Sequence, residues 1–408
     1  MKLHIATVVV GLSMIAFAHP AAPGHIPGDR LIENLTKRIP KEQGNAELYY
    51  LIGRAHYATY SRALETSWSK EGEVEIYNYD EKLPHFYSLP GNIYPWDSKS
   101  VVADTTDNRR HVEGAIKNLR LAIEMTEGKT AARVPANAGL AHLTLACTLD
   151  SGSPLAGKVT LVEPYKAWKN SKQWLAEAAK EYLLAFQKSK VPEAHYTEKP
   201  IFGLQTMVTY EAGLSYLRLQ PNAPDSKEVR AEVDRLKKLP PPHMITPLVL
   251  DLTESRKLDE LLQPATKVNF DLDGSGRNQN YGWVKPTTAF LVWDPEHKGK
   301  ITSGRQLFGN ATWWMLWDNA YAALDALDDN HDGWLTSKEL KGLALWYDRN
   351  GNGKSDPGEV IPIEQTQISA LNTHSDGRDG LSFSSSEGLK LKDGRVLPTY
   401  DWVTKTTN

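Results

Sequence analysis

The stretch LDDNHDGWLTSKELKGLALWYDRNGNGKSDPGE, residues 327–359, carries the pattern from which the fold of the C-terminal half of this chain is predicted. It contains two 12-residue segments, 328–339 and 348–359, called loop 1 and loop 2 from here on. In both, Asp or Asn occupies positions 1, 3 and 5, Gly occupies position 6 and Glu occupies position 12. A single match of this kind could be an ordinary polar turn, because Asp, Asn and Gly favour turns. Two complete matches separated by a short apolar segment indicate a repeated binding site.

This spacing suits a calcium ion. Ca²⁺ takes six to eight oxygen ligands, which a tightly curved loop supplies from alternate residues, with a bidentate Glu closing the far side. The sequence therefore predicts two calcium sites with EF-hand spacing. The predicted ligands of loop 1 are Asp328, Asn330, Asp332, the Trp334 carbonyl, Thr336 through a water, and Glu339; those of loop 2 are Asp348, Asn350, Asn352, the Lys354 carbonyl, Asp356 and Glu359.

Two weaker loops precede this pair. One begins with Asp271, Asp273 and Ser275, but Gly282 occupies its closing position, so a third calcium site there needs closure from elsewhere. The other, 294–306, has Lys298 at the third ligand position, where an ammonium group repels calcium. The segment 337–347 is expected to be one helix shared by loops 1 and 2. Such a shared helix favours a compact unit held by metal over a sensor that opens a groove.

The order VNFDLDGSG, YGWVKPTTAFLVWDP, GRQLFGN, YAALDALDDNHDGWL, LALWYDRNGNGKSDPGEV extends the pattern over residues 244–363. This region resembles the EF-hand-type calcium-binding region of secreted bacterial proteins, which is also seen beside haemolysin-type calcium repeats. The resemblance implies a compact calcium-binding module with little β structure and without catalytic activity. Ser275, Lys298 and Gln306 depart from the family's pattern, and these departures affect the two weaker loops.

Large side chains and turn signals complete the C-terminal prediction. Most tryptophans here are expected in a core, with Trp313, Trp314 and Trp317 as the exposed exceptions. The Lys-Asp-Gly-Arg turn at 392–395, between two alternating segments, indicates a hairpin that adds a small sheet.

Residues 27–239 are predicted to form a helical domain. Paired apolar helices with small residues, such as one with Gly53 and a partner with Ala115, Leu119 and Ala122, resemble tetratricopeptide repeats, although insertions break the period, the longest at 64–108. The alternatives are a concave groove for a peptide or partner protein and a plain helical bundle. The prolines at 240–242 end the last helix. The predicted fold class is thus mainly α, with a tetratricopeptide-like domain at 27–239 and a compact EF-hand-like domain with a small β component at 243–403.

The N-terminus and composition bear on location and partners. Residues 1–18 have a positive start, an apolar run and small residues at the end, as in a secretory signal peptide, which predicts a secreted or periplasmic protein. No segment approaches the ~20 apolar residues of a membrane-spanning helix. Cys147 is the only cysteine, so an internal disulfide is excluded. The net charge of −3 gives no polybasic surface for nucleic acid.

Catalytic patterns are missing from the sequence. The Gly-Lys-Thr at 128–130 lacks the upstream glycine of a phosphate loop, since Ile123 stands there. We therefore predict an exported, non-enzymatic protein in which calcium is structural and the helical domain is a scaffold for a protein or peptide. The alternative is a secreted hydrolase or carbohydrate-binding accessory protein whose site lies in the N-terminal helical domain, at the aromatic insertion 64–108.

Overall fold

The computed structural model describes residues 26–61, 67–70, 73–76, 104–127, 134–190, 201–236, 245–254, 257–274 and 278–404. The predicted signal peptide, most of the aromatic insertion, the prolines at 240–242 and Ser275 lie outside these residues.

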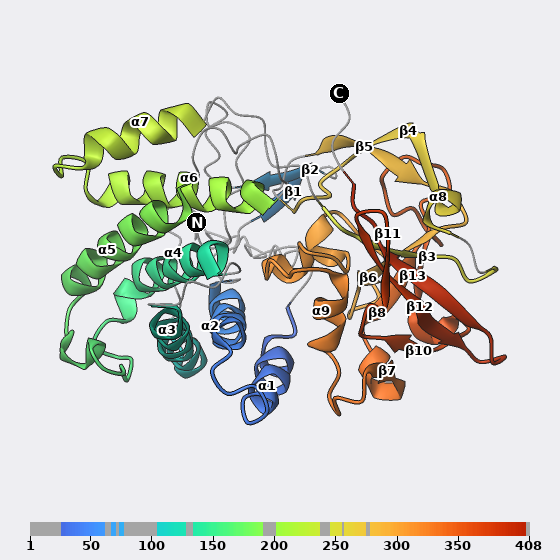
Figure 1. Cartoon of the computed structure of the whole chain (residues 1–408), viewed down its shortest axis with the longest axis horizontal. Coiled ribbons are helices and arrows are strands. Elements are labelled where there is room, and N and C mark those ends of the chain that lie inside the picture. Colours follow the sequence, from blue (N-terminus) through green and yellow to red (C-terminus); the bar gives the residue numbers. More distant parts are fainter. Residues whose placement is uncertain are drawn as a thin grey trace, which may run out of the picture.

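The N-terminal half is a curved stack of helices in which each helix packs mainly on its neighbours in the chain (Figure 1). A Cβ atom on Gly53 would lie 2.7 Å from Leu119, so glycine is needed where α2 and α3 approach. Thr105 caps α3 by accepting a hydrogen bond from the Asn108 amide at 3.0 Å. The helices are α1 (Gly28–Arg38), α2 (Ala46–Ser61), α3 (Thr106–Thr126), α4 (Val134–Gly152), α5 (Ser171–Ser189), α6 (Ile201–Leu219) and α7 (Ser226–Leu236).

The C-terminal half is built on a curled antiparallel sheet, so the prediction of a mainly α protein with a compact EF-hand-like domain is wrong. Within the described residues nine strands belong to this sheet, in the order β7-β10-β12-β13-β3-β6-β8-β9, with β11 paired to β12. The hairpin at 392–395 joins β12 to β13. The strands are β3 (Leu248–Leu250), β6 (Ala289–Trp293), β7 (Trp334–Thr336), β8 (Leu343–Trp346), β9 (Val360–Pro362), β10 (Ile368–Asn372), β11 (Gly377–Asp379), β12 (Ser382–Leu391) and β13 (Val396–Asp401).

The segment between loops 1 and 2 is not the predicted helix. It forms a short 3₁₀ turn, Ser337–Leu340, and then the strand β8, which pairs with β6 and β9. All four β8 residues are buried, and alternate ones enter different cores: Leu343 and Leu345 on one face of the sheet, Ala344 and Trp346 on the other. A strand covered on both faces is apolar throughout, and over so short a run its pattern cannot be told from that of a helix.

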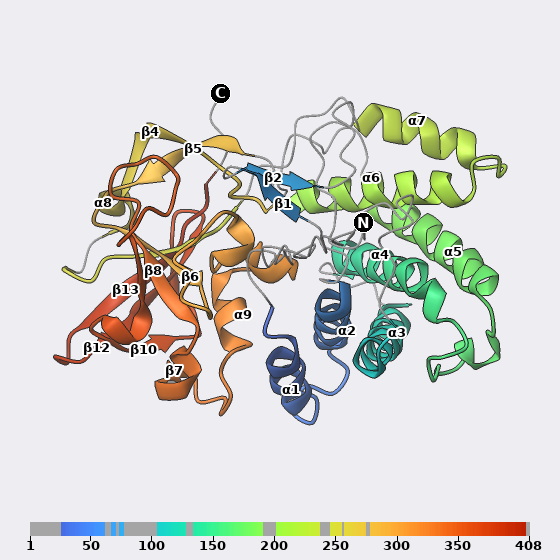
Figure 2. The ribbon, with the colours of Figure 1, turned by 180° about the vertical axis from the view of Figure 1, so that it is seen from behind.

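Each face of the sheet has its own cover. The hairpin of β4 (Leu262–Phe270) and β5 (Gln279–Val284), with the short α8 (Leu258–Leu261), shares a core with one face. The helix α9 (Ala320–Asp325) covers the other and lies between the sheet and the helical stack, as the views from both sides show (Figures 1 and 2). Leu31 of α1 and Ala55 of α2 belong to this second core as well. The helical stack and the sheet therefore share buried surface. A separate two-stranded ribbon pairs β1 (Ser67–Lys70) with β2 (Glu73–Ile76).

The turn before α9, residues 312–317, is unusual in its backbone. Trp313, Trp314 and Leu316 all have left-handed φ angles, of 51°, 58° and 59°. Such angles are costly for residues other than glycine and persist only where the surroundings hold them. Here Arg54 of α2 donates two hydrogen bonds to the Trp314 carbonyl, at 2.7 and 3.1 Å. Trp313, Trp314 and Trp317 are all buried, so their predicted exposure is wrong.

Candidate metal-binding loops

Loop 1 is organised around the carboxylates at its two ends. Asp328 accepts hydrogen bonds from the backbone amides of His331 at 2.7 Å and Gly333 at 2.8 Å. Glu339 accepts from the amides at positions 2 and 9, at 3.0 and 2.9 Å. Gly333 has a φ of 89°, which turns the chain back on itself. Backbone amides of the loop itself therefore hold both end carboxylates in place.

Loop 2 repeats this backbone almost position for position. Asp348 accepts from the amides of Asn352 at 3.1 Å and Gly353 at 2.8 Å. Glu359 accepts from the amides at positions 2 and 9, at 2.8 and 3.1 Å. The first and last side chains of both loops are buried, with residue exposures of 0% to 4% for Asp328, Glu339, Asp348 and Glu359. The same sequence pattern thus yields the same loop in two places.

The polar side chains in the middle of each loop converge. In loop 2, Asp356 at position 9 accepts hydrogen bonds from the side chains of Asn350 and Asn352, at 2.7 and 2.8 Å. In loop 1, the Asn330 amide donates to the Asp332 carboxylate at 3.0 Å. The predicted side-chain ligands at positions 3, 5 and 9 therefore meet in loop 2, and those at positions 3 and 5 meet in loop 1. Trp334 and Lys354, expected to contribute carbonyls, lie at position 7.

Burial changes the ionisation of one end carboxylate. The pKa of Asp348 is raised by burial, although the Gly353 and Asn352 amides and the Trp283 side chain act in the opposite direction. The negative charge of Glu359 adds to the rise. A buried carboxylate with a second one nearby is stabilised by a cation, because the cation offsets both the lost hydration and the repulsion.

The first of the weaker loops places Asp271 and Asp273 together. Both are buried, and burial raises the pKa of Asp271, helped by the charge of Asp273. Gln279 donates a hydrogen bond to Asp273. In the other weaker loop, 294–306, Lys298 was predicted to repel calcium from the third ligand position. Its ammonium pairs with Glu296, while the Asp294 carboxylate accepts backbone amides of its own turn.

Helix α1, from the other half of the molecule, contacts loop 1 through hydrogen bonds and an ion pair. Arg30 forms an ion pair with Asp329 at 2.8 Å and donates to the carbonyls of Leu327, at 2.6 Å, and Glu339, at 3.3 Å. Asn34, which is 1% exposed, donates to Asp329 at 2.9 Å. These contacts join residues about 300 positions apart, and the local sequence pattern gives no signal for them. They were missed by the sequence analysis.

Over the described ranges, no group of three or more His, Cys, Asp and Glu side chains is placed to hold a metal ion. Any cation in loop 1 or loop 2 would therefore depend on asparagine and main-chain oxygens as well as carboxylates, which is usual for calcium. In the same part of the chain, every helix is too short or too polar to cross a membrane.

Comparison with known proteins changes the family assignment. Residues 248–401 match the family described as SPM domain. The "Iron-regulated protein FrpA" of Neisseria meningitidis serogroup C is 28% identical over 177 residues, which cover 39% of this chain and 16% of that protein. The match is to an SPM domain built on a β sheet. The predicted membership of an EF-hand-type calcium-binding family is therefore wrong, as is the low β content that it implied.

Proposed function

We propose that this chain is an exported, non-enzymatic protein in which loops 1 and 2 each hold a calcium ion as a structural element of the sheet. One observation carries the proposal: two segments in different surroundings adopt the same backbone and bury the same two carboxylates. Ordinary polar turns have no reason to repeat a buried pair of acids. A hard cation gives that reason, because it compensates the buried charge.

The position of the loops in the fold supports a structural role. Loop 1 contains β7, which lies at one end of the strand order, and loop 2 connects β8 to β9 at the other end. A cation in loop 1 would therefore hold the edge strand β7, and a cation in loop 2 would hold the start of β9. Between loops 1 and 2, the short 3₁₀ turn and β8 stand where a calcium sensor has the pair of helices that it moves, which favours a structural role.

The remaining parts of the proposal rest on the sequence and on the helical stack. The signal-peptide pattern of residues 1–18 supports a secreted or periplasmic location, where millimolar calcium can fill weak sites. The curved stack of α1 to α7 supports a scaffold for a protein or peptide partner, as curved helical arrays present extended concave surfaces.

Isothermal titration calorimetry with CaCl₂ on the metal-stripped protein tests the calcium sites. We expect two sites in the wild type, with Glu339→Gln abolishing or weakening one by about tenfold or more, and Glu359→Gln doing the same to the other, because each removes a closing carboxylate. Glu387→Gln is the matched control. It makes the same change at an exposed position of β12 outside both loops and should bind like the wild type.

Two outcomes would overturn the proposal. One is an absence of saturable calcium binding up to ~10 mM, well above the range of extracellular calcium modules. The other is binding that both loop variants leave as unchanged as the Glu387→Gln control does.

A further inference from the structure

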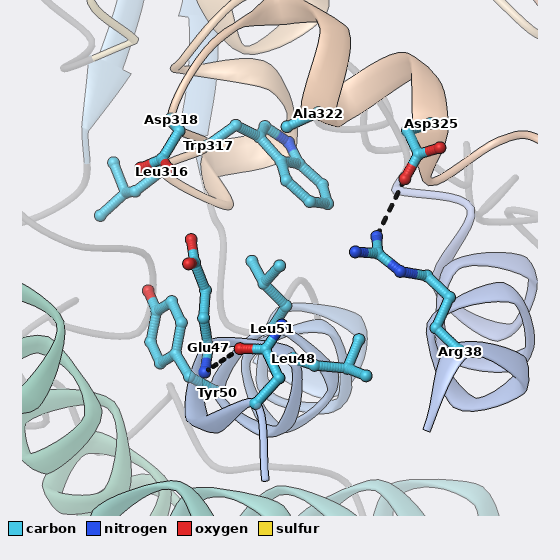
Figure 3. A pocket seen from close by; sticks show the side chains of 11 residues that line it. Arg38, Glu47, Leu48, Tyr50, Leu51, Leu316, Trp317, Asp318, Ala322 and Asp325 are labelled. Carbon is cyan, nitrogen blue, oxygen red and sulfur yellow. Dashed lines mark hydrogen bonds and ion pairs between the residues drawn. The ribbon is translucent and has the colours of Figure 1, made fainter. Parts of the chain in front are cut away.

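A cavity of about 200 Å³ lies between α2 and the turn that precedes α9, at the boundary between the helical stack and the sheet. Figure 3 shows its walls: Tyr50 and Leu51 rise from α2, and Leu316 and Trp317 face them from the turn. The volume is below the ~300 Å³ at which pockets for drug-sized ligands begin, so it suits a group the size of one side chain. None of its lining residues belongs to loop 1 or loop 2.

The lining has an excess of negative charge. Three carboxylates, those of Glu47, Asp318 and Asp325, face it with one guanidinium, that of Arg38. Arg38 pairs with Asp325 at 2.9 Å and also with Glu42 at 2.7 Å, so its charge is already shared between two acids. In Figure 3 the Glu47 side chain extends from α2 toward the side where Asp318 lies. The excess of negative charge therefore favours a cation in this cavity.

A buried hydroxyl supplies a further acceptor. Tyr50 is 3% exposed, and its hydroxyl has no hydrogen-bond partner among the described residues. In Figure 3 this hydroxyl points to the same side as the Glu47 carboxylate. A buried polar group without a partner is costly, which favours a ligand that satisfies it. With Glu47 and Asp318 it makes three acceptors, and a primary ammonium group has three N–H donors.

Apolar side chains line much of the rest of the cavity. Leu51 comes from α2, Leu316 and the Trp317 indole come from the turn, and the indole Nε1 donates to the Thr312 carbonyl at 3.2 Å. Leu316 has a left-handed φ of 59°, so it belongs to the strained part of this turn. Methylene groups would pack against these side chains, while an ammonium group at their end would meet the acceptors.

We propose that this cavity binds a primary alkylammonium group. The source is either a free diamine or a lysine side chain of a polypeptide, since both present the same ammonium on the same aliphatic stem. The two carboxylates and the tyrosine hydroxyl would accept the hydrogen bonds of the ammonium group, and the apolar side chains would pack against its aliphatic stem.

Calorimetric titration of the full-length protein tests this proposal with two probes, 1,5-diaminopentane and Nα-acetyl-lysine methylamide. We expect saturable 1:1 binding of at least one probe, weakened about tenfold or more by Glu47→Gln and by Asp318→Asn, because each removes a charged acceptor. Glu33→Gln on the exposed face of α1 is the matched control and should leave binding unchanged. Ala322→Phe, which fills the cavity, should abolish binding. Thermal melts establish that each variant is folded, and the two isosteric variants decide the matter if Ala322→Phe is not.

Each outcome has a defined meaning. Binding of the diamine alone identifies free diamines as the source, and binding of the lysine derivative alone identifies a polypeptide. The proposal is overturned if neither probe binds, if Nα,Nε-diacetyl-lysine methylamide binds as well as the amine, or if the two acid variants bind like Glu33→Gln.

Discussion

Loops 1 and 2 have the same sequence pattern and the same internal hydrogen bonds, but they have different neighbours. Loop 1 is held by Arg30 and Asn34 of α1, from the opposite half of the chain. Loop 2 packs on β4 of its own half, where a Cβ atom on Gly353 would lie 2.6 Å from Val268. The shared pattern thus produces the same internal hydrogen bonds in both loops, while their neighbours differ: α1 contacts loop 1 and β4 contacts loop 2.

Position 2 shows how a single residue separates the two loops. In loop 1 it is Asp329, which pairs with Arg30 across the two halves of the molecule. In loop 2 it is Arg349, an exposed residue that donates to the Gly358 carbonyl of its own loop at 2.9 Å. Neither residue is a predicted ligand. Position 2 therefore couples loop 1 to α1, whereas in loop 2 it bonds only within the loop.

The largest expected effect comes from adding a methyl group at position 6. Gly353→Ala should lower the free energy of unfolding by about 2–4 kcal/mol, because it combines a left-handed φ of 70° with the contact on Val268. Gly333→Ala should cost only about 1–2 kcal/mol, since its nearest neighbour is His374 at 3.5 Å and only the backbone strain remains. Urea unfolding in calcium-free buffer measures both. Equal losses would show that the packing of loop 2 on β4 contributes nothing.

A smaller effect is expected from the residues at position 2. Asp329→Ala should cost about 1–2 kcal/mol, because it removes charge-assisted hydrogen bonds that are half-buried between α1 and loop 1. Arg349→Ala should cost less than about 0.5 kcal/mol, as is usual for exposed charges. Chemical unfolding of the two variants under the same conditions makes the comparison. A larger loss in Arg349→Ala would contradict the assignment of α1 to loop 1.

The smallest effect is a difference in pH dependence between the loops. Burial would raise the pKa of Asp329, but its hydrogen bonds to Arg30 and Asn34 outweigh burial and lower it. Its contribution to stability is therefore present above the ordinary pKa of ~3.9 and is lost as the pH falls through the lower folded value. For Asp348 the pKa is raised, chiefly by burial, so its contribution has the opposite sign and is lost as the pH rises.

Unfolding of metal-free wild type and Asp329→Asn between pH 3 and pH 7 tests this difference. The gap between them should be largest at pH 7 and close toward pH 3. It should stay below about 1 kcal/mol, since solvent screens the pair. A gap that widens as the pH falls would show that Asp329 is not stabilised as a carboxylate.

The sequence could predict the loops because their geometry is local. The backbone hydrogen bonds to the carboxylates of Asp328 and Glu339 join residues at most 10 positions apart. The fold around them could not be obtained in this way. A 12-residue loop does not specify whether helices or strands flank it, and Leu343 to Trp346 is apolar at every position because both of its faces are buried.

The contact between loop 1 and α1 is the clearest example of a feature that no local sequence pattern predicts. Arg30 and Asn34 have the spacing of neighbours on one helical face, which is common on ordinary surfaces. Their partners follow in the chain after almost 300 residues. The burial of Trp313, Trp314 and Trp317 was missed for a related reason: it depends on a strained turn held by Arg54 from α2.

Amide hydrogen exchange of α1, with calcium and with chelator, tests most directly the proposed calcium site in loop 1 together with the contacts that join this loop to α1. We predict that calcium slows exchange in residues 28–38 of the wild type and of Glu359→Gln, and has no effect there in Glu339→Gln. Calcium should still protect loop 2 in Glu339→Gln. The account is contradicted if calcium leaves exchange in α1 unchanged in the wild type, or if the two variants lose the protection of α1 equally.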